Sequence, residues 1–293
     1  MSPLFNTPSM CQNTLFILGN GFDISHGIKS RYSDFKQWVS AQGDQRLIGL
    51  MDIFFSNERD LWSDIEKALG EYDEEAILEF CRPDEEIDYD HMMRSVAAIE
   101  DAPDWIFKPV LDQFVDYFNA WVESIDISQA KPRFSFSPVA QYLTFNYTDT
   151  LESVYNIPSS QITHIHGSRI NKNGEYIMGH NDWRDPDKHD TLSGEFYFEQ
   201  DTKNKIIRWM NGMKKDTARI INEHAPFFCG LSSTDTVIVR GHSLDRVDWP
   251  YFEEVVQRVA PTAQWTFHHH TPEDLKHIQE FTAHVGLKSY ALV

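Results

Sequence analysis

The hydrophobic pattern of this chain alternates between two kinds of segment. Short apolar runs rich in β-branched and aromatic residues are typical of buried strands. Longer stretches with an apolar residue at every third or fourth position are typical of helices that bury one face. The short runs predict strands within residues 14–19, 140–148, 162–167, 175–180, 235–243, 264–270 and 288–293.

The helical pattern fills the segments between these runs. Strands that alternate with helices of this length favour a mostly parallel sheet covered on both faces. We therefore predict one α/β domain over residues 1–293 with a Rossmann-like core. An acidic helical insertion at 44–127 and a second, mainly helical insertion at 183–230 interrupt it. The helical pattern is found within residues 32–39, 59–80, 106–125, 149–160, 202–225, 247–260 and 272–285.

Composition narrows the class of protein. The 293 residues, 41% of them hydrophobic, suffice for a large core. No segment approaches the roughly 20 apolar residues of a membrane span, and the first residues lack the pattern of a signal peptide. We therefore expect a cytoplasmic protein that makes no contact with a membrane.

Net charge and cysteine content argue against further classes of protein. The formal net charge of −19 at pH 7 would repel a phosphate backbone, so general nucleic-acid binding is not expected. Cys11, Cys81 and Cys229 stand far apart in the sequence. They predict neither a disulfide framework nor a zinc site made of thiolates.

Polar and glycine-rich segments follow the predicted strands directly. In a parallel sheet the carboxyl ends of the strands meet at one edge, and ligands bind outside that edge. We therefore expect the residues that follow the strands to gather into one site. Those residues include Gly19, Asn20, Gly21, Phe22 and Asp23; Asn146 and Asp149; His166; His180 and Asp182; and Gly241, His242, Ser243 and Asp245.

The turn after the first predicted strand contains two glycines, Gly19 and Gly21, where a simple turn needs one. Such a pair lets a backbone approach a pyrophosphate closely and present N–H groups to it. The same pair can also serve only to form a tight turn with positive φ. The sequence leaves both explanations open.

Several motifs occur in an order that resembles one known family. They are GNGFDISHGI followed by YSDF, then TFNYTDTLE, HIHGS, IMGH and VIVRGHSLDRVDWPYF. Together they resemble the AbiH family of bacteriophage abortive-infection proteins over most of the chain. More distantly, the set is similar to the sirtuin-like NAD-binding fold. The resemblance implies an anti-phage defence protein with a sirtuin-like core and with NAD as its ligand or substrate.

The resemblance also implies roles for the residues at the sheet edge. Asn20 and Asp23 depart from the sirtuin motif, which has alanine and serine there, and the carboxylate of Asp23 would repel phosphate. The identity of the nucleotide therefore stays open. By similarity, catalysis depends on Asn146 and His166. The nucleotide would contact Gly19, Asn20, Gly21, Phe22, Asp23, Asp149, Gly241, His242, Ser243 and Asp245.

The reaction implied by the resemblance is hydrolysis of the nicotinamide–ribose bond. Deacylating sirtuins carry a four-cysteine zinc module, which three scattered cysteines cannot build, so deacylation is not expected. Loss of nicotinamide develops positive charge on the ribose, as in glycoside hydrolysis. Asn146 can hold the ribose or a water, and His166 can accept a proton. No metal is expected for this chemistry.

Each of these side chains also has a purely structural explanation. His166 can be a strand-end histidine bonded to backbone, and Asn146 can be a turn residue with a local side-chain bond. Asp149 can cap the helix that begins near Thr150, and Ser243 can cap the helix that follows it.

Two other classes of function remain open. A metal-dependent hydrolase or nuclease could use His164, His166, His180 and Asp182, because His164 and His166 have the spacing of ligands on one strand face. A non-catalytic nucleotide sensor or partner-binding protein could use the same polar edge without turnover. For each class of function, the defence function included, a phage-derived trigger and a second copy of this chain, forming a homo-oligomer, are candidate partners.

Overall fold

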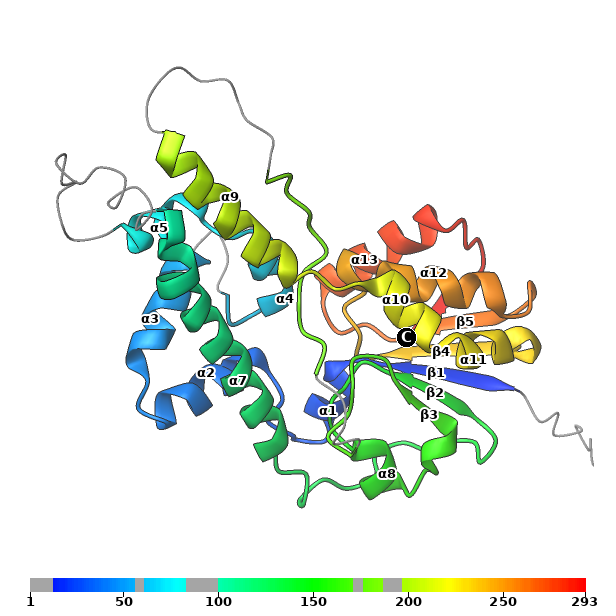
Figure 1. Ribbon diagram of the computed structural model, residues 1–293. Helices are drawn as coiled ribbons and strands as arrows, with labels where there is room; N and C mark the ends of the chain where they lie inside the picture. The colour runs from blue at the N-terminus through cyan, green and yellow to red at the C-terminus, as the bar shows by residue number, and fades with distance from the viewer. Residues whose placement is uncertain (1–12, 56–60, 83–99, 171–175, 187–196) are drawn as a thin grey trace, which may run out of the picture. The chain divides into compact units, whose positions relative to one another are not determined.

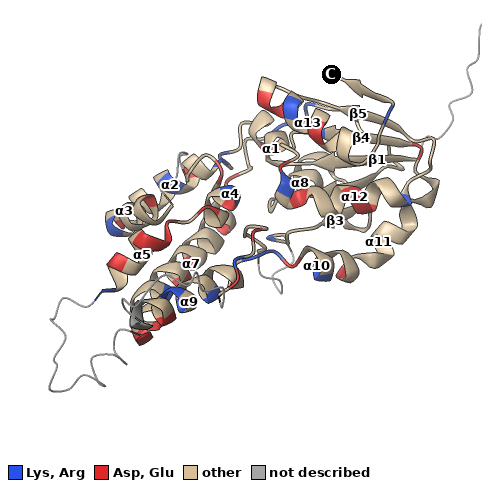
Figure 2. Ribbon diagram, turned by 90° about the horizontal axis from the view of Figure 1, so that it is seen from above, with Lys and Arg blue, Asp and Glu red and all other residues tan. Residues whose placement is uncertain are grey.

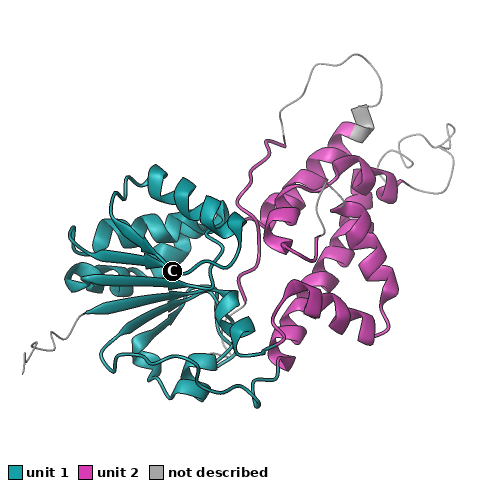
Figure 3. Cartoon of the chain, turned by 180° about the vertical axis from the view of Figure 1, so that it is seen from behind, with its two compact units in different colours: residues 1–28, 126–174, 217–293 teal, residues 29–125, 175–216 magenta. Residues whose placement is uncertain are grey.

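The computed structural model describes residues 13–55, 61–82, 100–170, 176–186 and 197–293 (Figure 1). The chain divides into two compact units, each made of separate segments (Figure 3). Unit 1 comprises Met1–Ile28, Asp126–Gly174 and Thr217–Val293, and unit 2 comprises Lys29–Ile125 and Glu175–Asp216. The predicted insertions at 44–127 and 183–230 overlap unit 2 with different boundaries. The prediction that residues 1–293 fold as one domain stays a prediction.

Unit 1 is built on a parallel sheet. Its strands are arranged in the order β3-β2-β1-β4-β5-β6, and every neighbouring pair is parallel. The order reverses direction between β1 and β4, as in doubly wound nucleotide-binding sheets. This confirms the predicted α/β, Rossmann-like fold class. The strands in the described residues are β1 (Thr14–Leu18), β2 (Gln141–Thr144), β3 (Ile162–His164), β4 (Thr236–Arg240), β5 (Gln264–Phe267) and β6 (Tyr290–Leu292).

Helices cover both faces of this sheet. Helix α8 lies on one side, and α12 and α13 lie on the other (Figures 1 and 3). On the α8 side, Leu18, Phe22, Tyr142 and Leu151 form a buried cluster that fixes α1 and α8 on the strands. The helices of unit 1 are α1 (Asn20–Ser25), α8 (Thr150–Tyr155), α10 (Thr217–Glu223), α11 (Ala225–Cys229), α12 (Trp249–Arg258) and α13 (Pro272–His284), with 3-10 turns at Ser159–Gln161, Gly230–Ser233 and Arg246–Asp248.

Unit 2 is helical in the part that the structure describes. Aromatic rings fill its core, where Phe35 contacts the rings of Trp62, Phe114 and Phe118. The ammonium of Lys215 is fully buried and lies 2.8 Å from the carboxylate of Glu66. Its helices are α2 (Tyr32–Ala41), α3 (Gln45–Phe54), α4 (Ile65–Gly70), α5 (Glu74–Cys81), a π-helical turn (Pro103–Phe107), α7 (Lys108–Ser124) and α9 (Tyr197–Gly212).

The acidic character of unit 2 is partly balanced by lysines on its own helices. Glu74 and Glu75 begin α5, which packs against α9 (Figure 2). From α9, Lys203 pairs with Glu75, and Lys205 pairs with Asp104. Such partly exposed pairs add little stability each, so they mainly keep like charges apart. The most acidic stretch of the predicted insertion is residues 73–92, of which 73–82 include α5 and 83–92 lie outside the described residues.

One predicted strand is wrong. Residues 176–179 form no strand, and His180 makes only an isolated bridge to Lys214. The carbonyl of His180 accepts the N–H of Lys215 at 2.8 Å, and Gly179 lies against the carbonyl of Met213. The end of this run, Gly179 and His180, is therefore buried against another segment of unit 2, and its apolar residues 176–178 are half-buried. Residue 175 lies outside the described residues.

In the described ranges, every helix falls short of a bilayer span in length or in apolar content, so none of them could cross a membrane.

Candidate functional site

The carboxyl edge of the sheet in unit 1 carries the two residues predicted to be catalytic. Asn146 and His166 each lie two residues beyond the end of a strand and are only 7% and 3% exposed. The ring of Phe145 contacts both His166 and His242 edge-on, with ring centroids 5.1 and 4.3 Å away. The structure therefore brings together side chains that follow β2, β3 and β4, as the sequence predicts.

The glycines at this edge allow two backbone turns to touch. A Cβ on Gly19 would lie 2.6 Å from the carbonyl oxygen of Gly241. A Cβ on Gly21 would lie 2.7 Å from the Cα of Gly241. The N–H of Gly21 donates to the carbonyl of Gly241 at 2.8 Å. Gly241 has φ +66°, a left-handed conformation that favours glycine.

This packing answers why the first turn contains two glycines. Positive φ is not the reason, because neither Gly19 nor Gly21 has it. The turn after β1 is pressed against the turn after β4, and a side chain at either position would separate them. The N–H of Gly21 is bonded to protein backbone, so any contact with phosphate would have to come from other atoms of this turn.

Asp23 is a buried carboxyl group directly behind the first turn. It is 1% exposed, and its Oδ2 accepts a 2.5 Å hydrogen bond from the hydroxyl of Thr148. Oδ1 is buried without a hydrogen-bond partner among the described residues. Burial raises the pKa of Asp23 from 3.8 to about 6, and hydrogen bonds from Thr148 and Thr150 offset only part of that effect.

The raised pKa of Asp23 predicts a pH-dependent stability. Between about pH 4 and pH 6 the folded protein holds this proton and the unfolded chain does not, so stability falls as the pH rises. Two pKa units correspond to about 3 kcal/mol. We expect the free energy of unfolding of the wild type to fall by about this amount relative to Asp23→Asn over that interval. Urea unfolding at several pH values measures it, and parallel curves for the two proteins would exclude a buried, titrating Asp23.

Polar contacts of charged and histidine side chains occur around the start of α8. The Nδ1 atom of His164 lies 2.9 Å from the carbonyl of Asn146, and its Nε2 lies 2.9 Å from Oε1 of Glu152. Asp149 precedes α8 but makes no side-chain cap. Its carboxylate instead binds Arg169 and Ser153. Burial alone would raise the pKa of Asp149, but the hydrogen bonds from Ser153 and Arg169 outweigh it and lower that pKa.

A carboxylate and two imidazoles form a second buried cluster at this edge. Nε2 of His242 lies 3.3 Å from Oδ2 of Asp248, and Nε2 of His166 lies 3.6 Å from Oδ1. Asp248 is the residue before α12, yet its side chain makes no capping bond there. Sequence reasoning missed Asp248 because an aspartate before a Trp-Pro helix start resembles an ordinary helix cap.

The other predicted contact residues lie around this centre in different ways. Asn20 and Ser243 are exposed, and Phe22 lies in the core cluster beside α8. The carbonyl of Ser243 binds Nδ1 of His277, and the carboxylate of Asp245 accepts the N–H of Arg246. These contacts neither require nor exclude a ligand, so the predicted roles in nucleotide binding stay predictions.

The proposed metal ligands do not form one cluster within a unit. His164 and His166 belong to unit 1, whereas His180 and Asp182 belong to unit 2. Within the described ranges, no group of three or more His, Cys, Asp or Glu side chains could hold a metal ion. Both ring nitrogens of His164 also lie against protein oxygens.

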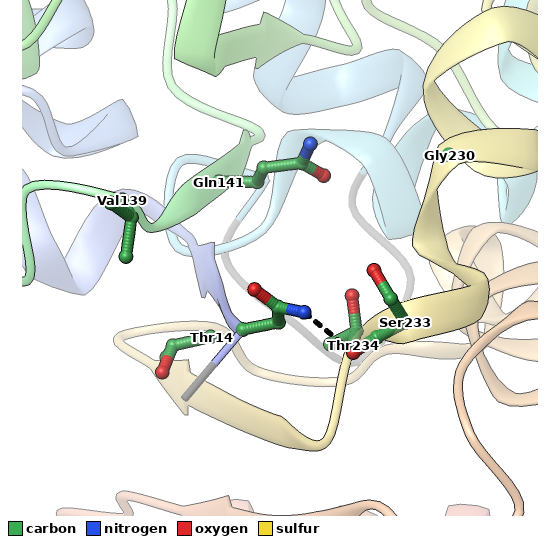
Figure 4. A pocket seen from close by; sticks show the side chains of 7 residues that line it. Thr14, Val139, Gln141, Gly230, Ser233 and Thr234 are labelled. Atoms are coloured by element: carbon green, nitrogen blue, oxygen red, sulfur yellow. Dashed lines mark hydrogen bonds between the residues drawn. The ribbon is translucent and has the colours of Figure 1, made fainter. Parts of the chain in front are cut away.

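A small pocket occurs at the opposite, amino-terminal edge of the sheet (Figure 4). Its lining carries no charged side chain, and Asn13 spans it by donating to the carbonyl of Ser233 at 3.1 Å. The residues that line it are Asn13, Thr14, Val139, Gln141, Gly230, Ser233 and Thr234. Ligands of parallel sheets bind at the other edge, so this pocket is not the candidate site.

A family model described as bacteriophage abortive infection AbiH matches residues 15–269, which span β1 to the end of β5 and include every residue of the candidate site. No curated protein and no solved structure matches the chain.

Proposed function

The chain belongs to the AbiH family of bacteriophage abortive infection proteins, and from that premise we propose that it defends the cell by binding and hydrolysing NAD or a related nucleotide. Abortive infection stops phage growth by disabling the infected cell, and loss of a central cofactor would do so. The nucleotide and the reaction are the proposed part.

The observation that carries this proposal is the amide of Asn146. Its Oδ1 is buried and has no hydrogen-bond partner among the described residues. A buried acceptor left in this state costs about 1–3 kcal/mol, which natural proteins rarely tolerate without a role for the group. The hydroxyl of a ribose or an attacking water is a donor of the kind that this oxygen lacks.

The remaining chemistry follows from groups at the same edge. Water attacks C1′ of the ribose while the C1′–nitrogen bond breaks, and nicotinamide leaves as a neutral base. His166 takes the proton that the water loses, so ADP-ribose and one proton are formed. The order of the strands favours a nucleotide at this edge, since the sheet reverses direction between β1 and β4.

The proposal is tested by incubating the purified protein with NAD, NADP and ATP and following each by chromatography. We expect free nicotinamide from NAD or NADP and intact ATP. Because the proposed groups are an amide and an imidazole, addition of a chelator should change the rate by less than about twofold. Stable nucleotides in the presence of protein that binds them would make it a sensor instead. Activity that a chelator abolishes and zinc or manganese restores would favour the metal-dependent hydrolase.

A further inference from the structure

The carboxylate of Asp248 lies between two imidazoles in the interior of unit 1. All three side chains are at least nine-tenths buried. Aromatic rings enclose them, since Phe145 lies edge-on to both imidazoles and Phe252 contacts His242 at 4.9 Å. A carboxylate in such surroundings needs hydrogen-bond donors, and the imidazoles of His166 and His242 can each supply one.

The tautomer of His242 is fixed by the backbone. Its Nδ1 accepts the N–H of Leu244 at 2.9 Å, so that nitrogen carries no proton. The ring proton must therefore be on Nε2, the atom that faces Asp248. A histidine in this state cannot use Nε2 to ligate a metal, but it is a permanent donor to the carboxylate.

The turn that carries His242 is held rigidly. Leu244 has φ +55°, which is rare for a bulky residue, and its carbonyl accepts the indole N–H of Trp249 at 2.9 Å. Backbone strain of this kind persists only where the surroundings enforce it, and it occurs often at functional sites. The turn thus fixes His242, and His242 fixes one oxygen of Asp248.

The second oxygen of Asp248 is directed at His166. The distance from Oδ1 to Nε2 of His166 is 3.6 Å, longer than a hydrogen bond. The interaction is electrostatic at this distance and would shorten when His166 gains a proton. A carboxylate in this position favours the tautomer with hydrogen on Nε2, which leaves Nδ1 as the atom that can accept a proton.

We propose that Asp248 is the positioning residue of His166 and that His242 holds Asp248 for this role. This inference rests on the proposed function, in which His166 accepts the proton of the attacking water. Asp248 would select the tautomer of His166 and stabilise the imidazolium that forms. The carboxylate of a catalytic triad acts on its histidine in the same manner.

The first test measures tautomers in the wild type and needs no substrate. Nitrogen-15 NMR of the histidine side chains should show the proton on Nε2 in both His242 and neutral His166. A neutral His166 with its proton on Nδ1 would overturn the inference. Because this readout is independent of turnover, it decides whether Asp248 sets the tautomer of His166 even if the protein cleaves no nucleotide.

The second test is Asp248→Asn, which keeps the shape of the side chain. An amide can accept from one histidine but must donate to the other, so His166 should be driven toward the opposite tautomer. We expect a loss in kcat of about 10²-fold with KM within about twofold. An unchanged kcat in the folded variant would contradict the inference. Should this variant fail to fold, the wild-type tautomers still decide.

A matched control lies on the same helix. Glu253 of α12 binds His284 with 2.8 Å between Oε1 and Nε2, on the surface. Glu253→Gln also replaces a carboxylate that contacts an imidazole, that of His284. This variant should leave both kcat and the NMR signals of His166 unchanged. Equal losses in both variants would show that Asp248→Asn acts only through a general loss of structure.

Discussion

Gly241→Ala lowers the free energy of unfolding by about 4 kcal/mol. Two costs add in this variant. Alanine in a left-handed conformation costs about 1–2 kcal/mol, and a Cβ at this position would lie 2.6 Å from the carbonyl carbon of Gly21, with the N–H of Phe22 also in the way. The obstacles are backbone atoms, so the turns after β1 and β4 must separate. Crowding of this kind costs about 1–3 kcal/mol or more.

Gly27→Ala is the control that separates these two costs. Gly27 also has a positive φ, +79°, but a Cβ there meets nothing within 4 Å. The free energy of unfolding of Gly27→Ala should therefore fall by only about 1–2 kcal/mol, the cost of the left-handed backbone conformation for alanine. Chemical unfolding of the three proteins in parallel measures both values. Equal losses in the two variants would show that contact between the turns contributes nothing.

His166→Gln and Asn146→Ala reduce nucleotide cleavage by about 10³-fold or more. The first removes the group that accepts the proton, and the second removes the acceptor that holds ribose or water. Glutamine is chosen at His166 because this ring is buried against Phe145 and Tyr251, and alanine would leave a cavity among them. Initial rates from chromatography, with the melting temperature of each variant, measure the effect.

His268→Gln is the matched control for this experiment. His268 also follows a strand of the same sheet, β5, and is partly buried, where its Nε2 binds Arg240 at 3.0 Å. It has no proposed role, so its cleavage rate should stay within about twofold of wild type. Full activity in a folded His166→Gln protein would remove His166 from the mechanism and leave Asn146 as a binding residue only.

Much of the fold could be predicted because buried parallel strands have short, continuous apolar runs. The segments around Ile17 and Val239 contain continuous apolar runs, the segment around Leu143 contains the polar residue Thr144, and all three occur at the expected places in the sheet. The gathering of Asn146, His166 and His242 at one edge followed from topology alone, since parallel strands end on the same side. Composition and periodicity were sufficient for both conclusions.

Other features depend on contacts between distant segments, which no local pattern contains. The reason for Gly19 and Gly21 is the backbone of Gly241, far along the chain. The run that ends at His180 has the length and composition of a strand, but among the described residues its one β-bridge is the isolated one from His180 to Lys214. Asp248 was missed because one of the two imidazoles that it faces, that of His166, follows a different strand, β3, more than 80 residues earlier.

The central position of β1 also has a consequence for the order of events during synthesis. Among the described strands of this sheet β1 leaves the ribosome first, yet its neighbours are β2 and β4, and β4 begins about 220 residues after β1 ends. At typical translation rates this delay lasts roughly 10–45 s. Throughout it, an apolar strand has one or both edges open, which is the condition that favours aggregation. Slowing elongation before residue 236 should therefore lower the yield of native protein, and a chaperone that covers the nascent strand should restore it.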